Sequence, residues 1–334
     1  MWESSKIEDE LKLRLENQGS SGEALWGRYV SARTLLVQQI LPWIGNNEPS
    51  LTDHGPEHIR NVLDNAYQLL GTGERLSTEE LYILCQAILF HDVGNIFGRK
   101  KHNQRINDVY GAVFNKLWLN RQEMALVVNI GRSHSGKSAD GTPDTLKDLN
   151  DDFIFGSKVR VQSLAAILRF ADELAEGPQR TSTYMIEMAA FAADSMIHHH
   201  YAQITSISID LGGGRVALTY HIDIEEIDFN DSKSLESFSE LIRFIYSRIH
   251  KLDSERRYCK HYSLFLEAYK KTSIYLNFWK GVEQLGLIGP PIELDDLFIP
   301  GVDTKDVEKI HPEYGIDILI PKLQKLSEEI RDEQ

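Results

Sequence analysis

Cysteine is scarce in this sequence. Only Cys85 and Cys259 occur among its 334 residues, and no CxxC pair is present. A disulfide framework or a cysteine-rich zinc site uses several cysteines at short spacings, so the sequence excludes both. The scarcity fits a protein of the reducing cytosol. Cys85 stands in an apolar helical stretch and is expected to be a small core residue.

Long apolar runs and an excess of positive charge are also missing. No apolar run approaches the roughly 20 residues of a membrane-spanning helix, and the N-terminal MWESSKIEDELKLR lacks a signal-peptide core. The net charge of −14 argues against a nucleic-acid polymer as partner. It also opposes an anionic substrate unless a metal or a local basic cluster inverts the field. We therefore expect a cytoplasmic protein that uses no membrane.

Helical spacing of apolar residues covers most of the first half of the chain. Two helices carry start signals: Pro56 follows Gly55, and Ser77 with Glu80 forms a capping box. Gly94 is expected to end the second of these helices. The other ranges with helical spacing are 1–45, 107–119, 121–131 and 157–175, with a polar loop at 133–153.

The pattern changes after about residue 200. The stretch YAQITSISIDLGGGRVALTYHIDI alternates apolar and polar residues around 212–214, which predicts a β-hairpin. The three glycines are not a phosphate loop, because GK[ST] and a following helix are absent. The histidines 198–200 are expected on a surface segment that leads into the hairpin.

The C-terminal third is predicted to be helical at 233–283, with a linker at 289–291 and a tail helix at 316–331. The aromatic run 258–279 suits a packed helical core. The alternatives are a base-stacking wall or a dimer face, so the sequence leaves homo-oligomerisation undecided. The predicted fold class is mainly α, with a small β-hairpin and a C-terminal helical extension. The predicted domains are 1–185, 186–232 and 233–334.

Ionisable side chains stand three or four positions from the apolar stripes of several helices. They are His58, the adjacent His91 and Asp92, and the distant Asp172. Residues at this spacing share a helix face, and a lone carboxylate buried there is costly. A cation removes that cost, and imidazoles with carboxylates suit divalent metals. The simpler alternative is that His91 and Asp92 only finish a helix.

The stretches DHGPEHIRNV, ILFHDVGN and ILRFADEL, in this order, resemble the HD-domain superfamily of metal-dependent phosphohydrolases. The resemblance covers roughly residues 30–185. It implies an HD-domain helical bundle in which His58, His91, Asp92 and Asp172 bind one divalent metal ion: Mn, Mg, Fe, Ni, Co or Zn.

The same resemblance extends to His102 and His134. In two-metal members, histidines at comparable places hold a second ion and Asp92 bridges the pair. Those members often show paired histidines where this chain has Ser133 and His134, so one ion and two ions both stay open. Catalytic roles are implied for Asp92, His102 and His134, which would orient water and transfer protons. The alternative for the two histidines is an exposed loop position.

Five residues near these motifs are candidates for binding substrate phosphate. Family members often have a lysine where this chain has Asn95, and a nearby basic side chain could replace its charge. The alternatives are a helix cap for the histidine and a solvated turn for the basic residues. The candidates are His54, Arg99, Lys101, Arg132 and Arg180.

The resemblance implies hydrolysis of a phosphate ester or anhydride. The implied substrate is a nucleotide, either a deoxynucleoside triphosphate or a cyclic or signalling nucleotide, or another phosphorylated small molecule. The alternative is a non-catalytic HD-fold regulatory or scaffold protein that binds a nucleotide or a protein partner.

Overall fold

The computed structural model describes residues 2–48, 52–72, 75–286, 288–297 and 306–333. The chain divides into two compact units, Met1–Ala175 with Tyr258–Glu267, and Glu176–Arg257 with Ala268–Gln334. Helices predominate, which confirms the mainly α prediction. The division into 1–185, 186–232 and 233–334 stays a prediction.

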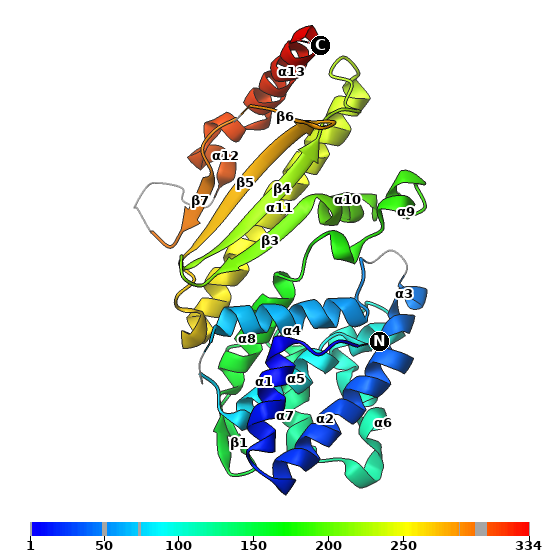
Figure 1. The fold of residues 1–334 in the computed structure, drawn as a ribbon, viewed down its shortest axis with the longest axis vertical. Coiled ribbons are helices and arrows are strands. Elements are labelled where there is room, and N and C mark those ends of the chain that lie inside the picture. Colours follow the sequence, from blue (N-terminus) through cyan, green and yellow to red (C-terminus); the bar gives the residue numbers. More distant parts are fainter. Residues whose placement is uncertain (1, 49–51, 73–74, 287, 298–305, 334) are drawn as a thin grey trace. The chain divides into compact units, whose positions relative to one another are not determined.

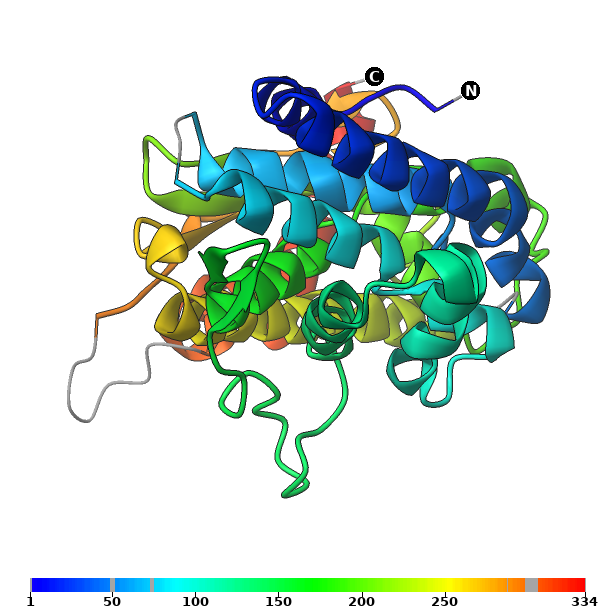
Figure 2. The ribbon, with the colours of Figure 1, turned by 90° about the horizontal axis from the view of Figure 1, so that it is seen from below.

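The first unit is built around a buried helix, α5. Every residue of α5 from Glu80 to Phe90 is buried, and α1, α4, α7 and α8 all contact it. Figure 2 shows the dark blue α1 and α2 along the outer side of the lighter blue α4 and α5. Its elements are α1 (Lys6–Glu16), α2 (Ser20–Gln39), η1 (Leu41–Trp43), α3 (Ile44–Asn47), α4 (Pro56–Leu70), α5 (Thr78–Phe90), η2 (Val93–Phe97), η3 (His102–Gln104), α6 (Ile106–Trp118), α7 (Arg121–Arg132), β1 (Asp152–Ile154), β2 (Ser157–Val159), α8 (Val161–Glu173) and η5 (Leu264–Leu266).

The second unit contains a five-stranded sheet (Figure 1), so the prediction of only a small hairpin was wrong in extent. The strands β3 and β4 form the predicted antiparallel hairpin, β4 pairs in parallel with β5, and β7 pairs with β5. Figure 1 shows α11 lying along one face of these strands. The elements are η4 (Pro178–Arg180), α9 (Thr183–Glu187), α10 (Met196–Ile204), β3 (Thr205–Asp210), β4 (Arg215–Asp223), α11 (Ser232–Tyr262), β5 (Lys271–Lys280), β6 (Glu283–Gln284), β7 (Ile292–Asp295), α12 (Val307–Ile310), η6 (Pro312–Tyr314) and α13 (Ile316–Glu333).

Several local predictions were wrong. The predicted helix over 233–283 ends at Tyr262, and β5 follows, because alternate residues of β5 face a buried layer and the strand pairs with β4. The predicted helix over 157–175 loses its first residues to β2, which pairs with β1. The predicted surface position fails for His199, which is buried in α10 and stacks on Phe191.

Gly94 does not end the helix that precedes it. The helix α5 ends at Phe90, and Gly94 lies inside the 3₁₀ turn η2. A Cβ at this position would meet the carbonyl oxygen of His102 at 1.9 Å. Glycine is therefore required because η2 and η3 approach each other closely here, a constraint that helical periodicity does not reveal.

The start of α5 is held by a buried carboxylate. The capping box forms as predicted, with the Glu80 amide donating to Ser77 Oγ and the Ser77 amide donating to Glu80 Oε2. Arg160 donates to the other oxygen, Glu80 Oε1, at 2.7 Å. Burial alone would raise the pKa of Glu80, but the hydrogen bonds from Arg160 and the Ser77 amide hold it below its ordinary value.

We expect Glu80→Gln to lower the free energy of unfolding at pH 7 by about 2 kcal/mol, the worth of hydrogen bonds to a charged group. Because the pKa of Glu80 is depressed by folding, its contribution exists above the unfolded pKa of about 4.3 and disappears as the pH falls through the folded pKa. The difference between variant and wild type should therefore shrink on acidification. Urea unfolding of both proteins at several pH values measures this difference in the free energy of unfolding. Glu16→Gln, in an exposed pair with Lys12, is the control and should change little.

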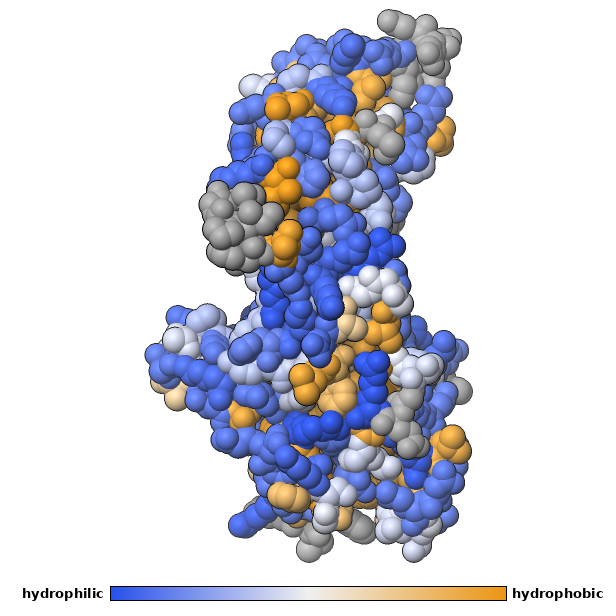
Figure 3. All heavy atoms as spheres, turned by 90° about the vertical axis from the view of Figure 1, so that its left-hand side faces the viewer, coloured by the Kyte–Doolittle hydropathy of each residue, from blue (hydrophilic) through white to orange (hydrophobic). Residues whose placement is uncertain are grey.

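No helix among the described ranges is both long and apolar enough to cross a membrane. On the face drawn in Figure 3, hydrophilic residues predominate and hydrophobic ones form small separate patches.

Candidate metal centre

Three helices of the first unit bring four ionisable side chains together. The side chain of His58 comes from α4, His91 caps the end of α5 with Asp92 directly after it, and Asp172 comes from α8. One ligand atom of each lies within 4.8 Å of those of the others. The separations are 3.2 Å from His58 Nε2 to Asp172 Oδ1, 3.6 Å from His58 Nε2 to Asp92 Oδ2, and 3.5 Å from His91 Nε2 to each of the same two oxygens.

A second group shares Asp92. His102, at the start of η3, and His134, just after α7, lie with Asp92 within the same ligand distance. Their Nε2 atoms are 3.3 Å and 3.5 Å from Asp92 Oδ1. The two oxygens of one carboxylate thus face different partners: Oδ2 faces His58 and His91, and Oδ1 faces His102 and His134.

The protonation of three histidines follows from their backbone contacts. The Nδ1 atoms of His91, His102 and His134 lie 2.8 Å, 3.1 Å and 2.5 Å from the carbonyl oxygens of residues 88, 99 and 131. A carbonyl oxygen only accepts, so each Nδ1 carries a proton and donates it. In the neutral ring, Nε2 then carries a lone pair that is directed at Asp92. This arrangement is typical of a metal-binding histidine.

When the rings are neutral, these lone pairs converge with no proton between them. His102 Nε2 and His134 Nε2 are only 3.1 Å apart, and both face Asp92 Oδ1. Within the described ranges, His58 Nε2, His91 Nε2 and Asp92 Oδ1 are buried and lack a partner with hydrogen-bond geometry. Buried acceptors that face one another are costly unless a cation lies among them. Both groups therefore fit a divalent metal ion.

The charges of the metal-free centre are strongly coupled. Burial would raise the pKa of Asp92 and of Asp172, but the surrounding histidines hold both pKa values well below the ordinary range. Burial lowers and the two carboxylates raise the pKa of His91, to about 10. Burial lowers the pKa of His134, so its ring is neutral at pH 7. A metal ion must displace the His91 proton, which makes metal binding release protons.

The structure places two predicted phosphate-binding residues beside the centre. His54 Nε2 and Arg99 Nη1 are each 3.9 Å from an Asp92 oxygen, Oδ2 and Oδ1 respectively. The Arg99 side chain is 45% exposed and the Asp172 side chain 23%, so the centre has a solvent-facing side. Their roles in binding substrate stay predictions.

The other three candidates lie in different local environments. Lys101 is exposed and adopts a left-handed backbone conformation before η3. Arg132 donates a hydrogen bond, 2.5 Å long, to Oδ1 of Asn107 on α6. Arg180 belongs to the second unit, where it pairs with Glu176 at 3.2 Å. Their substrate-binding roles also stay predictions.

The positioning role of one residue was not predicted from the sequence. Arg169, on α8 one turn before Asp172, donates to Thr145 Oγ1 at 2.9 Å and to the Ser133 carbonyl at 3.3 Å. Its guanidinium also stacks on Tyr258, at 4.7 Å from the ring centre. These contacts hold the segment that carries His134. The only sequence signal is the basic residue inside the apolar stretch ILRFADEL.

Comparison with known proteins gives one family. The family model described as HD-CE matches residues 48–256, more than half of the chain, and this range contains both ligand groups. No curated protein and no solved structure matches the chain.

Proposed function

This chain belongs to the HD-CE family, and from that premise we propose that its centre is a two-metal phosphohydrolase site. The proposed reaction is hydrolysis of a phosphate ester or anhydride. The proposed substrate is a nucleotide, either a deoxynucleoside triphosphate or a cyclic or signalling nucleotide.

The observation that carries the proposal is the division of Asp92 between two ligand groups. Each oxygen of Asp92 faces its own pair of histidine Nε2 atoms. A carboxylate shared in this way is suited to bridge two cations, and paired cations are a common solution for phosphoryl transfer. Asp172 would complete the first set with His58 and His91.

A divalent cation supplies Lewis-acid polarisation of a phosphoryl oxygen and a lowered pKa for water. The chain's own groups do the rest. The Nδ1 protons of His91, His102 and His134 are held by backbone carbonyls, which fixes the three rings before substrate arrives. In this proposal Arg99, half-exposed beside Asp92, would bind a phosphate oxygen, and His54 would share or pass a proton through Nε2.

The negative net charge of the chain requires local compensation for an anionic substrate. The segment 99–101, Arg-Lys-Lys, supplies three positive charges between η2 and the start of η3, where His102 stands. Together with bound cations, this segment would invert the field at the mouth of the centre.

The test is direct. The purified chain, loaded with Mn²⁺, is incubated with deoxynucleoside triphosphates, cyclic mononucleotides, cyclic and linear dinucleotides and simple phosphomonoesters, and products are identified by ³¹P NMR. We expect release of phosphate, triphosphate or an opened phosphodiester from at least one class. Metal-loaded protein that binds a nucleotide or a protein partner and hydrolyses none would support the non-catalytic HD-fold alternative instead.

A further inference from the structure

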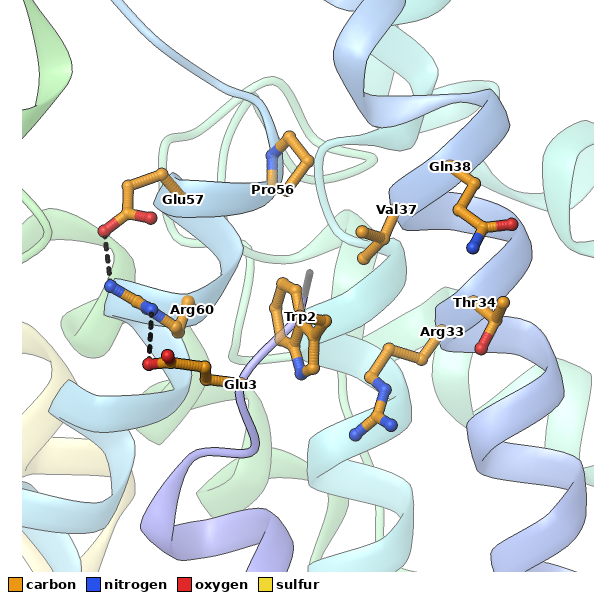
Figure 4. A pocket seen from close by; sticks show the side chains of 9 residues that line it. All are labelled: Trp2, Glu3, Arg33, Thr34, Val37, Gln38, Pro56, Glu57 and Arg60. Atoms are coloured by element: carbon orange, nitrogen blue, oxygen red, sulfur yellow. Dashed lines mark hydrogen bonds and ion pairs between the residues drawn. The ribbon is translucent and has the colours of Figure 1, made fainter.

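A cavity of about 620 Å³ lies in the first unit between the N-terminal segment, α2 and the first turns of α4 (Figure 4). Its volume is within the range of small-molecule sites. Figure 4 shows the Trp2 indole in the middle, with residues of α2 on one side and residues of α4 on the other. None of its lining residues belongs to the two ligand groups of the metal centre.

The aromatic wall of this cavity is fixed from behind. Trp2 Nε1 donates to Glu8 Oε2 at 3.2 Å, and Arg33 Nη1 donates to Glu8 Oε1 at 2.7 Å. The Glu8 carboxylate is fully buried and also accepts from Ser5 and Tyr29. Because these donors converge on one buried charge, the indole and the neighbouring guanidinium are ordered before any ligand binds, which lowers the entropic cost of binding.

The opposite wall offers an exchangeable positive charge. Arg60, on α4, pairs with Glu57 at 2.8 Å and with Glu3 at 3.8 Å. The Glu3 side chain is 86% exposed, and an ion pair this exposed contributes little to stability. An anionic ligand group can therefore replace Glu3 at Arg60. The amino-terminal end of α4 adds a field that favours negative charge, while the Glu57 carboxylate stays paired with Arg60.

Two polar side chains on the α2 side of the cavity can read the edge of a ring (Figure 4). Thr34 and Gln38, both exposed on α2, line the same cavity and together offer hydrogen-bond donors and acceptors. An ordered indole, an available guanidinium and an amide define one class of ligand: a flat heteroaromatic ring that carries a phosphate.

We propose that this cavity is a second ligand site, separate from the metal centre, that binds a nucleoside monophosphate or a molecule of that chemical class. The ring stacks on Trp2, its edge bonds to Thr34 or Gln38, and its phosphate pairs with Arg60. Because Pro56 and Glu57 directly precede His58 on α4, the ligand contacts the helix turn that presents His58 to the metal centre.

The test is calorimetric titration of the full chain, in excess EDTA, with the monophosphates of adenosine, guanosine, cytidine and uridine and with the free nucleosides. We expect saturable binding of at least one monophosphate. Trp2→Ala should weaken it by roughly 5- to 150-fold, the range for loss of one stacked base. Trp2→Phe, which keeps a ring, should retain most of the affinity. Arg60→Gln should reduce the affinity for the monophosphate to that for its nucleoside.

Two controls locate the site. Trp43→Ala removes a tryptophan that is 55% exposed and outside the cavity, and Asp92→Asn alters the metal centre; both should leave the affinity unchanged. Circular dichroism checks that each variant is folded. The proposal is overturned if no monophosphate binds at millimolar concentration, if Trp2→Ala and Trp2→Phe both bind as the wild type does, or if Asp92→Asn abolishes binding. None of these outcomes depends on hydrolysis, so they are distinct from failure of the proposed function.

Discussion

Replacement of Asp92 by asparagine is expected to abolish hydrolysis and to weaken metal binding at both ligand groups. The carboxylate is the one residue that the groups share, and each of its oxygens faces a separate pair of histidines. Asparagine keeps the size but loses the charge and one acceptor. Mutation of residues that only hydrogen-bond to metal ligands typically lowers metal affinity by about 10- to 100-fold. Loss of the shared ligand itself should therefore lower the Mn²⁺ affinity by more than about 100-fold.

The measurement combines equilibrium metal binding with turnover of whichever substrate the panel identifies. Asp108→Asn is the matched control. The Asp108 carboxylate is exposed on α6, where it pairs with Arg105 and accepts a hydrogen bond from the neighbouring Asn107. It should bind metal and turn over normally. Full activity in Asp92→Asn, with Asp108→Asn also active, would remove the proposed mechanism.

Replacement of His134 by glutamine is expected to lower the metal content from two ions to one for each chain. His134 and His102 are the histidines on the Oδ1 side of Asp92. Without His134, only His102 and Asp92 of this ligand group remain, and two protein ligands do not hold an ion firmly. The first group is left intact, so one ion should stay bound. Hydrolysis should fall at least about 100-fold, because the second cation no longer stabilises charge in the transition state.

Elemental analysis of dialysed protein, together with turnover, makes this measurement. His221→Gln is the control, since His221 is exposed on β4 in the second unit. An unchanged metal content in His134→Gln would contradict the two-ion proposal and leave a single-ion centre at His58, His91, Asp92 and Asp172.

The first ligand group could be predicted from sequence because it depends on helical periodicity. His58 and Asp172 stand on the apolar stripes of α4 and α8, so packing of those stripes brings the side chains together. The approach of His102 depends instead on two 3₁₀ turns and on Gly94, where the backbone of η2 meets that of η3. No periodic pattern encodes such a contact, and only the family resemblance pointed to His102.

The strand β5 was predicted as helix because its residues are as aromatic and apolar as those of the helix before it. Its identity is set by parallel pairing with β4, a partner far away in sequence. The wall of the cavity had a readable signal that was missed: Ser5 and Glu8 form a capping box at the start of α1. What no local signal encodes is that the same Glu8 also binds Trp2 and Arg33.

The central claim is that imidazoles and carboxylates from separate helices surround cations on both sides of Asp92. Anomalous scattering from crystals grown with Mn²⁺ tests it most directly. The account predicts two anomalous peaks, one within ligand distance of His58, His91 and Asp172 and the other within ligand distance of His102 and His134, with Asp92 touching both. Well-ordered crystals with no peak among these side chains would contradict it.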